Sequence, residues 1–148
     1  MPPAGAVIPP FRNDGYLPEG LFLALEADVL FRFGACSRRR QRLVLRLRQW
    51  LELAQLTGAR RFLVDGSFVT AKPEPDDIDA VVLLSPDFQG RIDRGDEAAI
   101  VFEEMLVSRR PEEIFAAEDE QDWEMWVEFF GRTREADGRR KGLVEIQL

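Results

Sequence analysis

Two short motifs in the middle of the sequence contain residue types that bind metal ions and phosphate groups. Gly66-Ser67 ends an apolar run, and nine residues separate it from Asp77-Ile78-Asp79, which opens the next apolar run. In an extended strand, Asp77 and Asp79 would point to one face about 7 Å apart, while Ile78 would enter the core. Paired carboxylates are typical ligands of Mg²⁺, and a Gly-Ser turn can donate hydrogen bonds to phosphate oxygens.

The acidic pair is more informative in this context than it would be alone. Aspartates commonly follow a proline turn, so an Asp-x-Asp motif by itself is weak support for a metal site. Here the pair leads directly into the apolar run 80–84. Burying a strand beside two acids costs several kcal/mol unless the acids find a cation or hydrogen bonds. Two acids at the start of a buried strand therefore favour a binding site.

The flanking sequence predicts the elements that position these motifs: an α/β (α+β) fold, with a small mixed sheet flanked by helices. The strands are expected over residues 61–65, 77–84 and 113–117, and the helices over 37–57 and 97–108. The segment between the first two strands contains Lys-Pro-Glu-Pro, which cannot be regular structure. These two strands should therefore form a hairpin-like pair.

The two ends of the chain are less regular. Residues 1–20 contain five prolines and three glycines, which predicts an extended arm ahead of a single domain over 21–148. The domain should begin with a helix over 21–33, where apolar residues recur at helical spacing. The C-terminal region fits either a helix or a hairpin. We expect a hairpin of 126–134 with 142–148, because the last segment is typical of a strand and needs a neighbour.

Composition excludes several classes of chemistry. The chain has 148 residues, no histidine and a single cysteine, Cys36. Without imidazole there is no Ser-His-Asp or Cys-His catalytic pair and no histidine-containing metal site, and one cysteine cannot form an internal disulfide. Catalysis would therefore depend on carboxylates, hydroxyl groups or bound ions.

Charge is unevenly distributed. The 27 acidic and 20 basic side chains give a net charge of −7, which argues against general affinity for nucleic-acid backbones. Eight of the arginines nevertheless lie between residues 37 and 61, against one acid, Glu52. We interpret this segment first as a solvated helix face whose arginines pair with acids elsewhere. An acidic partner and RNA stay open as alternatives.

The sequence also predicts a cytoplasmic location without membrane association. The N-terminus lacks the basic and apolar regions of a signal peptide. The longest uncharged apolar stretch beyond it, 80–86, is far shorter than the ~20 residues that span a bilayer.

The central motif resembles that of the nucleotidyltransferase superfamily, whose members share a polymerase-beta-like catalytic core. The family signature, a Gly-Ser at the end of one strand followed at this distance by Asp-x-Asp, matches at Gly66, Ser67, Asp77 and Asp79. The run VDGSFVTAKPEPDDIDAVVLL is similar to an uncharacterised group of small bacterial proteins on that fold, as are LPEG, FFGRTRE and KGLVEIQL.

The resemblance implies a function. Gly66 and Ser67 would bind the phosphates of a nucleoside triphosphate, with Lys72 as a further positive charge, and Asp77 and Asp79 would hold Mg²⁺ (or Mn²⁺). A nucleotidyl group would move to an acceptor hydroxyl of RNA, protein or a small molecule. One departure is the 68–72 stretch, which replaces a glycine often found after Gly-Ser in the family.

Active members of the superfamily add a third carboxylate from a later strand, which completes a metal site or acts as a base. Its order along the chain favours Glu113, with Glu118, Asp119 and Glu145 as alternatives. Two further groups have more than one interpretation. Trp123, Trp126, Phe129 and Phe130 can stack on a base or fill the core, and Arg132 and Arg134 can hold an anionic substrate or pair with acids.

Other functions remain open. The chain can be a non-catalytic module on the same fold that binds or regulates a protein partner, or forms a homodimer. It can also be a toxin or defence component that modifies tRNA or protein.

Overall fold

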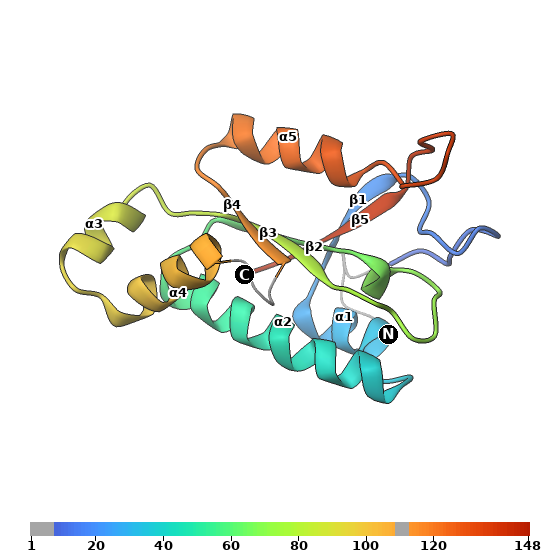
Figure 1. Ribbon diagram of the computed structural model, residues 1–148, viewed down its shortest axis with the longest axis horizontal. Coiled ribbons are helices and arrows are strands. Elements are labelled where there is room, and N and C mark those ends of the chain that lie inside the picture. Colours follow the sequence, from blue (N-terminus) through green and yellow to red (C-terminus); the bar gives the residue numbers. More distant parts are fainter. Residues whose placement is uncertain (1–7, 109–112) are drawn as a thin grey trace.

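A computed structural model describes residues 8–108 and 113–148. It contains a five-stranded mixed sheet with helices on both faces, which confirms the predicted α+β class (Figure 1). The strands are β1 (Gly20–Ala24), β2 (Arg61–Asp65), β3 (Asp79–Leu83), β4 (Glu113–Ala117) and β5 (Gly142–Ile146). The helices are α1 (Glu26–Phe33), α2 (Arg38–Leu56), α3 (Phe88–Asp93), α4 (Glu97–Ser108) and α5 (Glu120–Phe130).

The strand order is β1-β5-β2-β3-β4, which places the two motif-bearing strands side by side. β2 and β3 are antiparallel neighbours, as predicted, and their register pairs Asp65 with Asp79. β4 is parallel to β3, and its register pairs Asp79 with Glu113. Three acidic residues therefore lie in a row across the same end of the sheet.

The two faces of the sheet are covered to different extents. One face packs against α1, α2 and α4 through a large apolar cluster that includes Phe62 and Val82. The other packs against α5 through a smaller cluster that includes Leu63 and Val81. Figure 1 shows α5 alone on its side of the sheet. Because side chains alternate along a strand, Asp65 and Asp79 belong to the α5 face.

Local signals account for the elements that were predicted correctly. Strands β2 and β4 and helix α4 are found at the expected residues, and α2 differs from its expected range only at its ends. Ser37 caps α2, since its side chain accepts a hydrogen bond from the Arg40 amide at 3.1 Å. Ile78 is fully buried, as predicted, although β3 begins at Asp79 rather than at Asp77.

The helix predicted over 21–33 is wrong in its first half. Residues Gly20–Ala24 form strand β1, and α1 begins only at Glu26. β1 is an edge strand that pairs in parallel with β5, more than a hundred residues later in the chain. Its apolar residues fit both periodicities, so the remote partner decides the outcome.

The predicted C-terminal hairpin is also wrong. Residues Glu120–Phe130 form helix α5, which Asp119 caps by accepting a hydrogen bond from the Asp122 amide at 2.8 Å. The last strand, β5, finds its neighbours in β1 and β2 instead. An isolated antiparallel bridge joins Arg132 to Arg140, which lies outside the predicted second strand.

The described part of the predicted N-terminal arm, residues 8–19, has no helix or strand but packs against the domain. Leu17 is 1% exposed, and its carbonyl accepts a hydrogen bond from the Gly142 amide at 3.0 Å. Helix α3 was not predicted. No helix among the described residues is long and apolar enough to cross a lipid bilayer.

Candidate functional site

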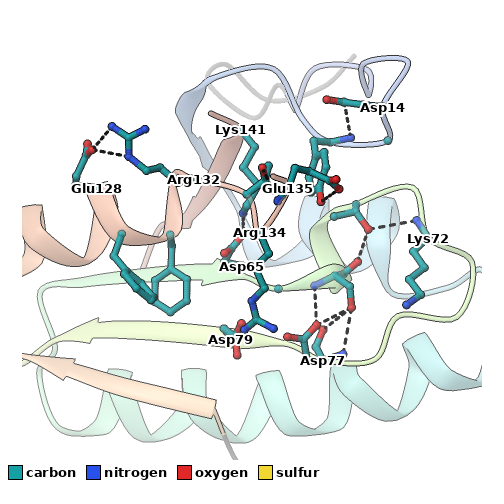
Figure 2. A pocket seen from close by; sticks show the side chains of 18 of the residues that line it. Asp14, Asp65, Lys72, Asp77, Asp79, Glu128, Arg132, Arg134, Glu135 and Lys141 are labelled. Atoms are coloured by element: carbon teal, nitrogen blue, oxygen red, sulfur yellow. Dashed lines mark hydrogen bonds and ion pairs between the residues drawn. The ribbon is translucent and has the colours of Figure 1, made fainter. Parts of the chain in front are cut away.

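A cleft of about 1290 Å³ opens at the end of the sheet where β2 finishes and β3 begins. Its walls come from four segments: the loop 14–16, residues 65–79, one side of α5, and the loop 132–141. Figure 2 shows Asp65, Asp77 and Asp79 at this end of the sheet, with Lys141 above Asp65 and the Arg134 side chain extending toward Asp79. The cleft contains five of the six predicted site residues, which are Gly66, Ser67, Lys72, Asp77 and Asp79.

Gly66 makes the turn that brings the two motifs together. Its φ is +86°, a conformation that other residues rarely adopt. A Cβ atom here would lie 3.0 Å from the carbonyl oxygen of Asp77 and from the amide of Asp79. Glycine is therefore required by the close approach of the chain's own backbone, whatever its role toward a phosphate.

Ser67 holds the carboxylate of Asp77. Its hydroxyl and its amide both donate to Asp77 Oδ1, at 2.6 and 2.9 Å. The same hydroxyl accepts from the amides of Asp76 and Asp77, at 2.8 and 3.1 Å. Burial opposes ionisation of Asp77, but the hydrogen bonds from Ser67 and the charge of Arg134 outweigh it and lower the pKa. Ser67 thus fixes an ionised Asp77 in one orientation.

Arginines at the start of α2 hold the loop between the motifs. The buried guanidinium of Arg40 donates to the carbonyls of Phe68, Thr70 and Lys72 at 2.6 to 2.8 Å. Arg39 donates to the carbonyl of Pro75 at 2.9 Å. The prediction that these arginines pair with acids is therefore wrong for Arg39 and Arg40, because their fixed forks of donors bind backbone carbonyls instead.

The pKa of Asp79 is raised more than that of Asp65, the other buried carboxyl group of the cleft. The side chain of Asp79 is on the α5 face and the residue is only 7% exposed. Burial raises the pKa of Asp79 to about 7, and the negative charges of Asp77, Asp65 and Glu113 add to this effect. Among the described residues, Asp79 makes no ion pair within 4.0 Å. A bound cation would relieve this repulsion.

Asp65 and Lys141 form a buried ion pair that the sequence reading missed. Lys141 Nζ contacts Asp65 Oδ1, and both side chains are less than 10% exposed. Burial raises the pKa of Asp65 to about 6, while the charge of Lys141 opposes this rise. One signal was available in the sequence, an acid at the end of the apolar run Phe62–Val64 directly before Gly66.

The four candidates for a third carboxylate lie at different distances from the pair Asp77 and Asp79. Glu113 lies beside Asp79 in the sheet and raises its pKa, but it is exposed and does not line the cleft. Glu118 and Asp119 follow the opposite end of β4, next to the start of α5. Glu145 is occupied by Arg61, with contacts of 2.7 and 2.8 Å. Only Glu113 is near the acidic pair, and Asp65 is the additional acid on the cleft floor.

Positive side chains also reach the cleft. Lys72 lines it but pairs with Asp76. Arg134 lies over the acidic floor in Figure 2, and its charge favours the ionised forms of both Asp77 and Asp79. Of the two roles predicted for Arg134, proximity to an anionic ligand and pairing with acids, this position is compatible with either.

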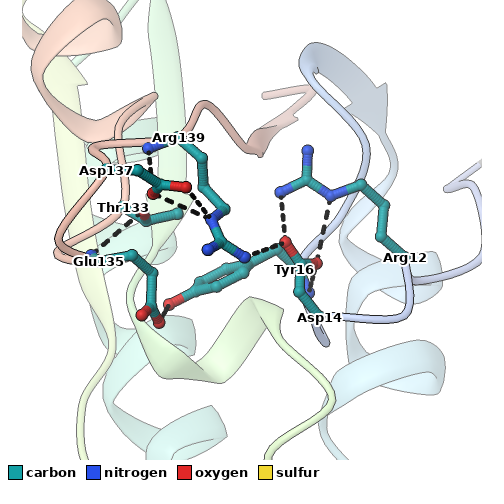
Figure 3. A network of polar contacts seen from close by, with 7 residues as sticks. All are labelled: Arg12, Asp14, Tyr16, Thr133, Glu135, Asp137 and Arg139. Atoms are coloured by element: carbon teal, nitrogen blue, oxygen red, sulfur yellow. Dashed lines mark hydrogen bonds and ion pairs between the residues drawn. The ribbon is translucent and has the colours of Figure 1, made fainter.

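A polar network closes one rim of the cleft (Figure 3). The Tyr16 hydroxyl donates to Glu135 Oε1 at 3.1 Å, and Arg139 contacts Asp14 at 3.5 Å. Arg12 makes a second ion pair with Asp14 at 3.0 Å. These contacts tie the N-terminal loop to the loop that carries Arg134 and Lys141.

The donor set suits a metal ion that shares its coordination with a substrate. Within residues 8–108 and 113–148, no group of three or more His, Cys, Asp or Glu side chains is arranged to hold a metal ion. Mg²⁺ commonly uses one or two carboxylates together with waters and substrate phosphates. Asp77, held in its ionised form, and Asp79, which lacks a cation partner in the described chain, fit this pattern.

Comparisons with known proteins identify the family. Searches of curated proteins and of solved structures gave no match. The profile of a family described as "Family of unknown function (DUF6932)" matches residues 9–147, which is nearly the whole chain. The chain therefore belongs to the DUF6932 family.

Proposed function

We propose that this protein is a nucleotidyltransferase that binds a nucleoside triphosphate with Mg²⁺ (or Mn²⁺) in the cleft. The observation that carries the proposal is the pairing of Asp77 and Asp79. Asp77 is held ionised by Ser67, and the buried Asp79 beside it has no ion-pair partner in the described chain. Both acids line an open cleft, whereas a filled cleft would argue for a purely structural role.

The chain's own residues would divide the binding of the triphosphate. Arg134 and Lys72 supply positive charge for the phosphate oxygens. Ser67 holds the carboxylate of Asp77, and Arg40 holds the loop between the two motifs through its backbone carbonyls, so both are in place before the ligand binds. When bound, Mg²⁺ would neutralise the phosphate charge and polarise the phosphorus centre.

The proposed reaction joins the oxygen of an acceptor hydroxyl to the α-phosphorus. The bond between the α-phosphorus and the oxygen that bridges to the β-phosphorus breaks, and pyrophosphate leaves with that electron pair. The hydroxyl proton passes to a carboxylate. We assign this role to Glu113, which lies outside the cleft but beside Asp79 at the sheet end, so the proton would reach it through water. The acceptor is a hydroxyl of RNA, protein or a small molecule.

Calorimetric titration of ATP in the presence and absence of Mg²⁺ tests the binding step. We expect Mg²⁺-dependent binding by the parent protein, and a loss of at least about tenfold in the Asp77→Asn/Asp79→Asn variant. The control is Asp87→Asn/Asp93→Asn, which removes two carboxylates from the α3 region without touching the cleft. Equal binding by parent and cleft variant, or none by either, would overturn the proposal.

Transfer requires a separate assay. The parent protein, an α-labelled nucleoside triphosphate and Mg²⁺ or Mn²⁺ are incubated with RNA, total protein or small hydroxyl compounds, and the label is followed into each fraction. Glu113→Gln should slow transfer while leaving ATP affinity within about twofold, because Glu113 acts on the acceptor proton.

A second candidate function is a non-catalytic module that binds the nucleotide without transferring it. It is favoured by the lack of a three-carboxylate metal group among the described residues, and by the exposure of Glu113. This module would pass the calorimetric test and fail the transfer assay with every acceptor and all four nucleotides.

A further inference from the structure

Helix α5 presents an apolar strip to the cleft. Met125 and Phe129 are each 66% exposed, and both line the cleft that contains Asp77 and Asp79. They are four residues apart, so they are neighbours on one side of the helix. Single exposed apolar side chains are ordinary, but an adjacent pair that opens into a charged cleft is not.

The structure separates the aromatic residues that could serve a ligand from those that fill the core. Trp123 is fully buried, and Phe130, although it reaches the cleft wall, is only 9% exposed, so both mainly fill the core. Phe129 contacts Trp126 and Phe130 through edge-on arrangements, with interplanar angles of 88° and 81°. These neighbours hold the Phe129 ring in one orientation while most of its surface stays accessible.

Two acids of α5, Glu124 and Glu128, line the cleft beside the strip, and the charge of Glu128 is matched by arginines. Glu128, on the same helix, binds Arg140 at 2.7 and 2.9 Å and Arg132 at 3.1 Å. The hydrogen bond from Arg140 and the other contacts of these arginines lower the pKa of Glu128 to about 2, so its charge is matched by cations. The cleft thus combines an acidic floor, cations and an apolar wall.

A ligand that covers all three features has phosphate groups at one end and a flat apolar group at the other. Inorganic polyphosphate would leave the apolar strip in water, and an uncharged aromatic compound would leave Arg134 and Lys72 unused. A nucleotide satisfies both regions, because every nucleobase has a flat π face that stacks on an aromatic side chain.

We propose that Phe129, supported by Met125, is the platform on which the nucleobase stacks. This inference rests on the proposed function, since it places the base of the same nucleoside triphosphate. Stacking reads the face of a base and not its hydrogen-bonding edge, so discrimination among bases is weak. The four nucleoside triphosphates should bind within about tenfold of one another, with the larger purines tighter.

The test compares two probes, Mg²⁺-ATP and Mg²⁺-tripolyphosphate, which carries the phosphates without the base. Phe129→Ala should weaken ATP binding about tenfold and leave tripolyphosphate binding unchanged. Phe129→Trp should retain ATP affinity. The control is Phe31→Ala, which removes an 86% exposed ring from α1, away from the cleft. Thermal unfolding of each variant checks that the fold is intact.

The outcomes distinguish the inference from the function on which it rests. If the parent binds ATP and tripolyphosphate equally, or if Phe129→Ala binds ATP as the parent does, the platform is overturned and the phosphate site stands. If neither probe binds the parent, the proposed function fails and the platform fails with it. If Phe129→Ala weakens both probes equally, Phe129 acts on the phosphate site and the platform is overturned.

Discussion

Strand β2 carries a charged residue at each end, and both point to the face of the sheet that α5 covers. Arg61 begins the strand beneath the start of α5, and Asp65 ends it in the cleft. The two residues lie on the same strand and the same face. Each has its own ion-pair partner from the C-terminal region, Glu145 for Arg61 and Lys141 for Asp65. They differ in how well the surrounding charges are matched.

The Arg61 end is balanced. Its guanidinium binds both oxygens of Glu145 at 2.7 and 2.8 Å, contacts Glu120 at 3.4 Å and lies 4.6 Å from the centre of the Trp123 ring. Bidentate geometry of this kind satisfies the planar guanidinium without further partners.

The Asp65 end has an excess of negative charge. Lys141 neutralises Asp65, but Asp79 lies between Asp65 and Glu113 with no cation within ion-pair distance in the described chain. The charge of Arg134 offsets this excess only in part, since the pKa of Asp79 stays raised, and Arg40 on α2 donates to backbone carbonyls. The protein therefore organises this end without neutralising it.

The difference indicates which charges serve the fold and which serve a ligand. A charge whose partners are all supplied by the chain needs nothing further. A buried carboxylate with a pKa raised to about 7 is a cost to stability that a cation would remove. Such groups cluster at functional sites, and this excess is why we assign function to the Asp65 end.

The largest effect is expected from breaking the ion pair between Asp65 and Lys141. Lys141→Met should lower the free energy of unfolding by about 3–5 kcal/mol, because it leaves Asp65 buried beside Asp79 without its cation. Urea denaturation measures this change. Adding Asp65→Asn should recover at least half of the loss, and Arg140→Met, at a partly exposed site whose ion pairs face solvent, should change stability much less. A loss no larger than that of Arg140→Met would contradict the proposed imbalance.

The clamp on the loop should give the next largest effect. Arg40→Met removes donors from three loop carbonyls and should cost about 2–4 kcal/mol of unfolding free energy. Hydrogen exchange should rise in residues 66–76, and Mg²⁺-dependent ATP affinity should fall with it. Arg42→Met, on the exposed side of the same helix, is the matched control. Unchanged exchange in the loop would show that Arg40 does not position the site.

Removing the unmatched charge should stabilise the protein. At pH 8 without Mg²⁺, Asp79→Asn should raise the free energy of unfolding by about 2 kcal/mol while abolishing Mg²⁺-dependent ATP binding. Chemical denaturation with and without Mg²⁺ measures both the gain and its dependence on the ion. A destabilised Asp79→Asn variant would show that the carboxylate is part of the fold.

The pH dependence follows from the same carboxylate. The folded pKa of Asp79 is about 7, above the unfolded value of about 3.9, so the folded state binds more protons between these values. Parent stability should therefore be highest at the acidic side of this window and fall as pH rises from about 4 to 7. Asp65, raised to about 6, contributes in the same direction. Asp79→Asn should flatten the curve, and a curve of equal slope in both proteins would exclude Asp79 as its source.

The smallest effect is expected at the balanced end. Glu145→Gln should cost about 1 kcal/mol, because Arg61 keeps Glu120 and the Trp123 ring as partners at a partly exposed site. Its Mg²⁺-dependent ATP affinity should equal that of the parent. A loss of ATP binding would break the contrast between the two ends, since Glu145 would then act on the site.

Much of the candidate site could be predicted because its signals are local. Gly66, Ser67, Asp77 and Asp79 lie within fourteen residues, and the strands on either side have clear apolar runs. The cap at Ser37 and the stripe of α2 likewise act over a few residues. The buried position of Ile78 followed from simple alternation.

The missed parts of the site depend on contacts between remote segments. The apolar run before Asp65 indicates a buried acid, but Lys141 is 76 residues away and no local pattern identifies it as the partner. The sequence pattern placed Arg40 on a solvated helix face, but in the structure it is buried and donates to the carbonyls of the loop. Glu145 was a reasonable third carboxylate until the register placed it at the Arg61 end.

The sequence by itself determined the α+β class, strands β2 and β4, helices α2 and α4, and the motif that gathers the acids. These depend on periodicity, caps and turns, which act between near neighbours. Only the tertiary structure decided that 20–24 is a strand, that 120–130 is a helix, and that one end of the sheet has an excess of negative charge. Strand partners, burial and the matching of charges depend on segments that meet only when the chain folds, so local patterns cannot fix them.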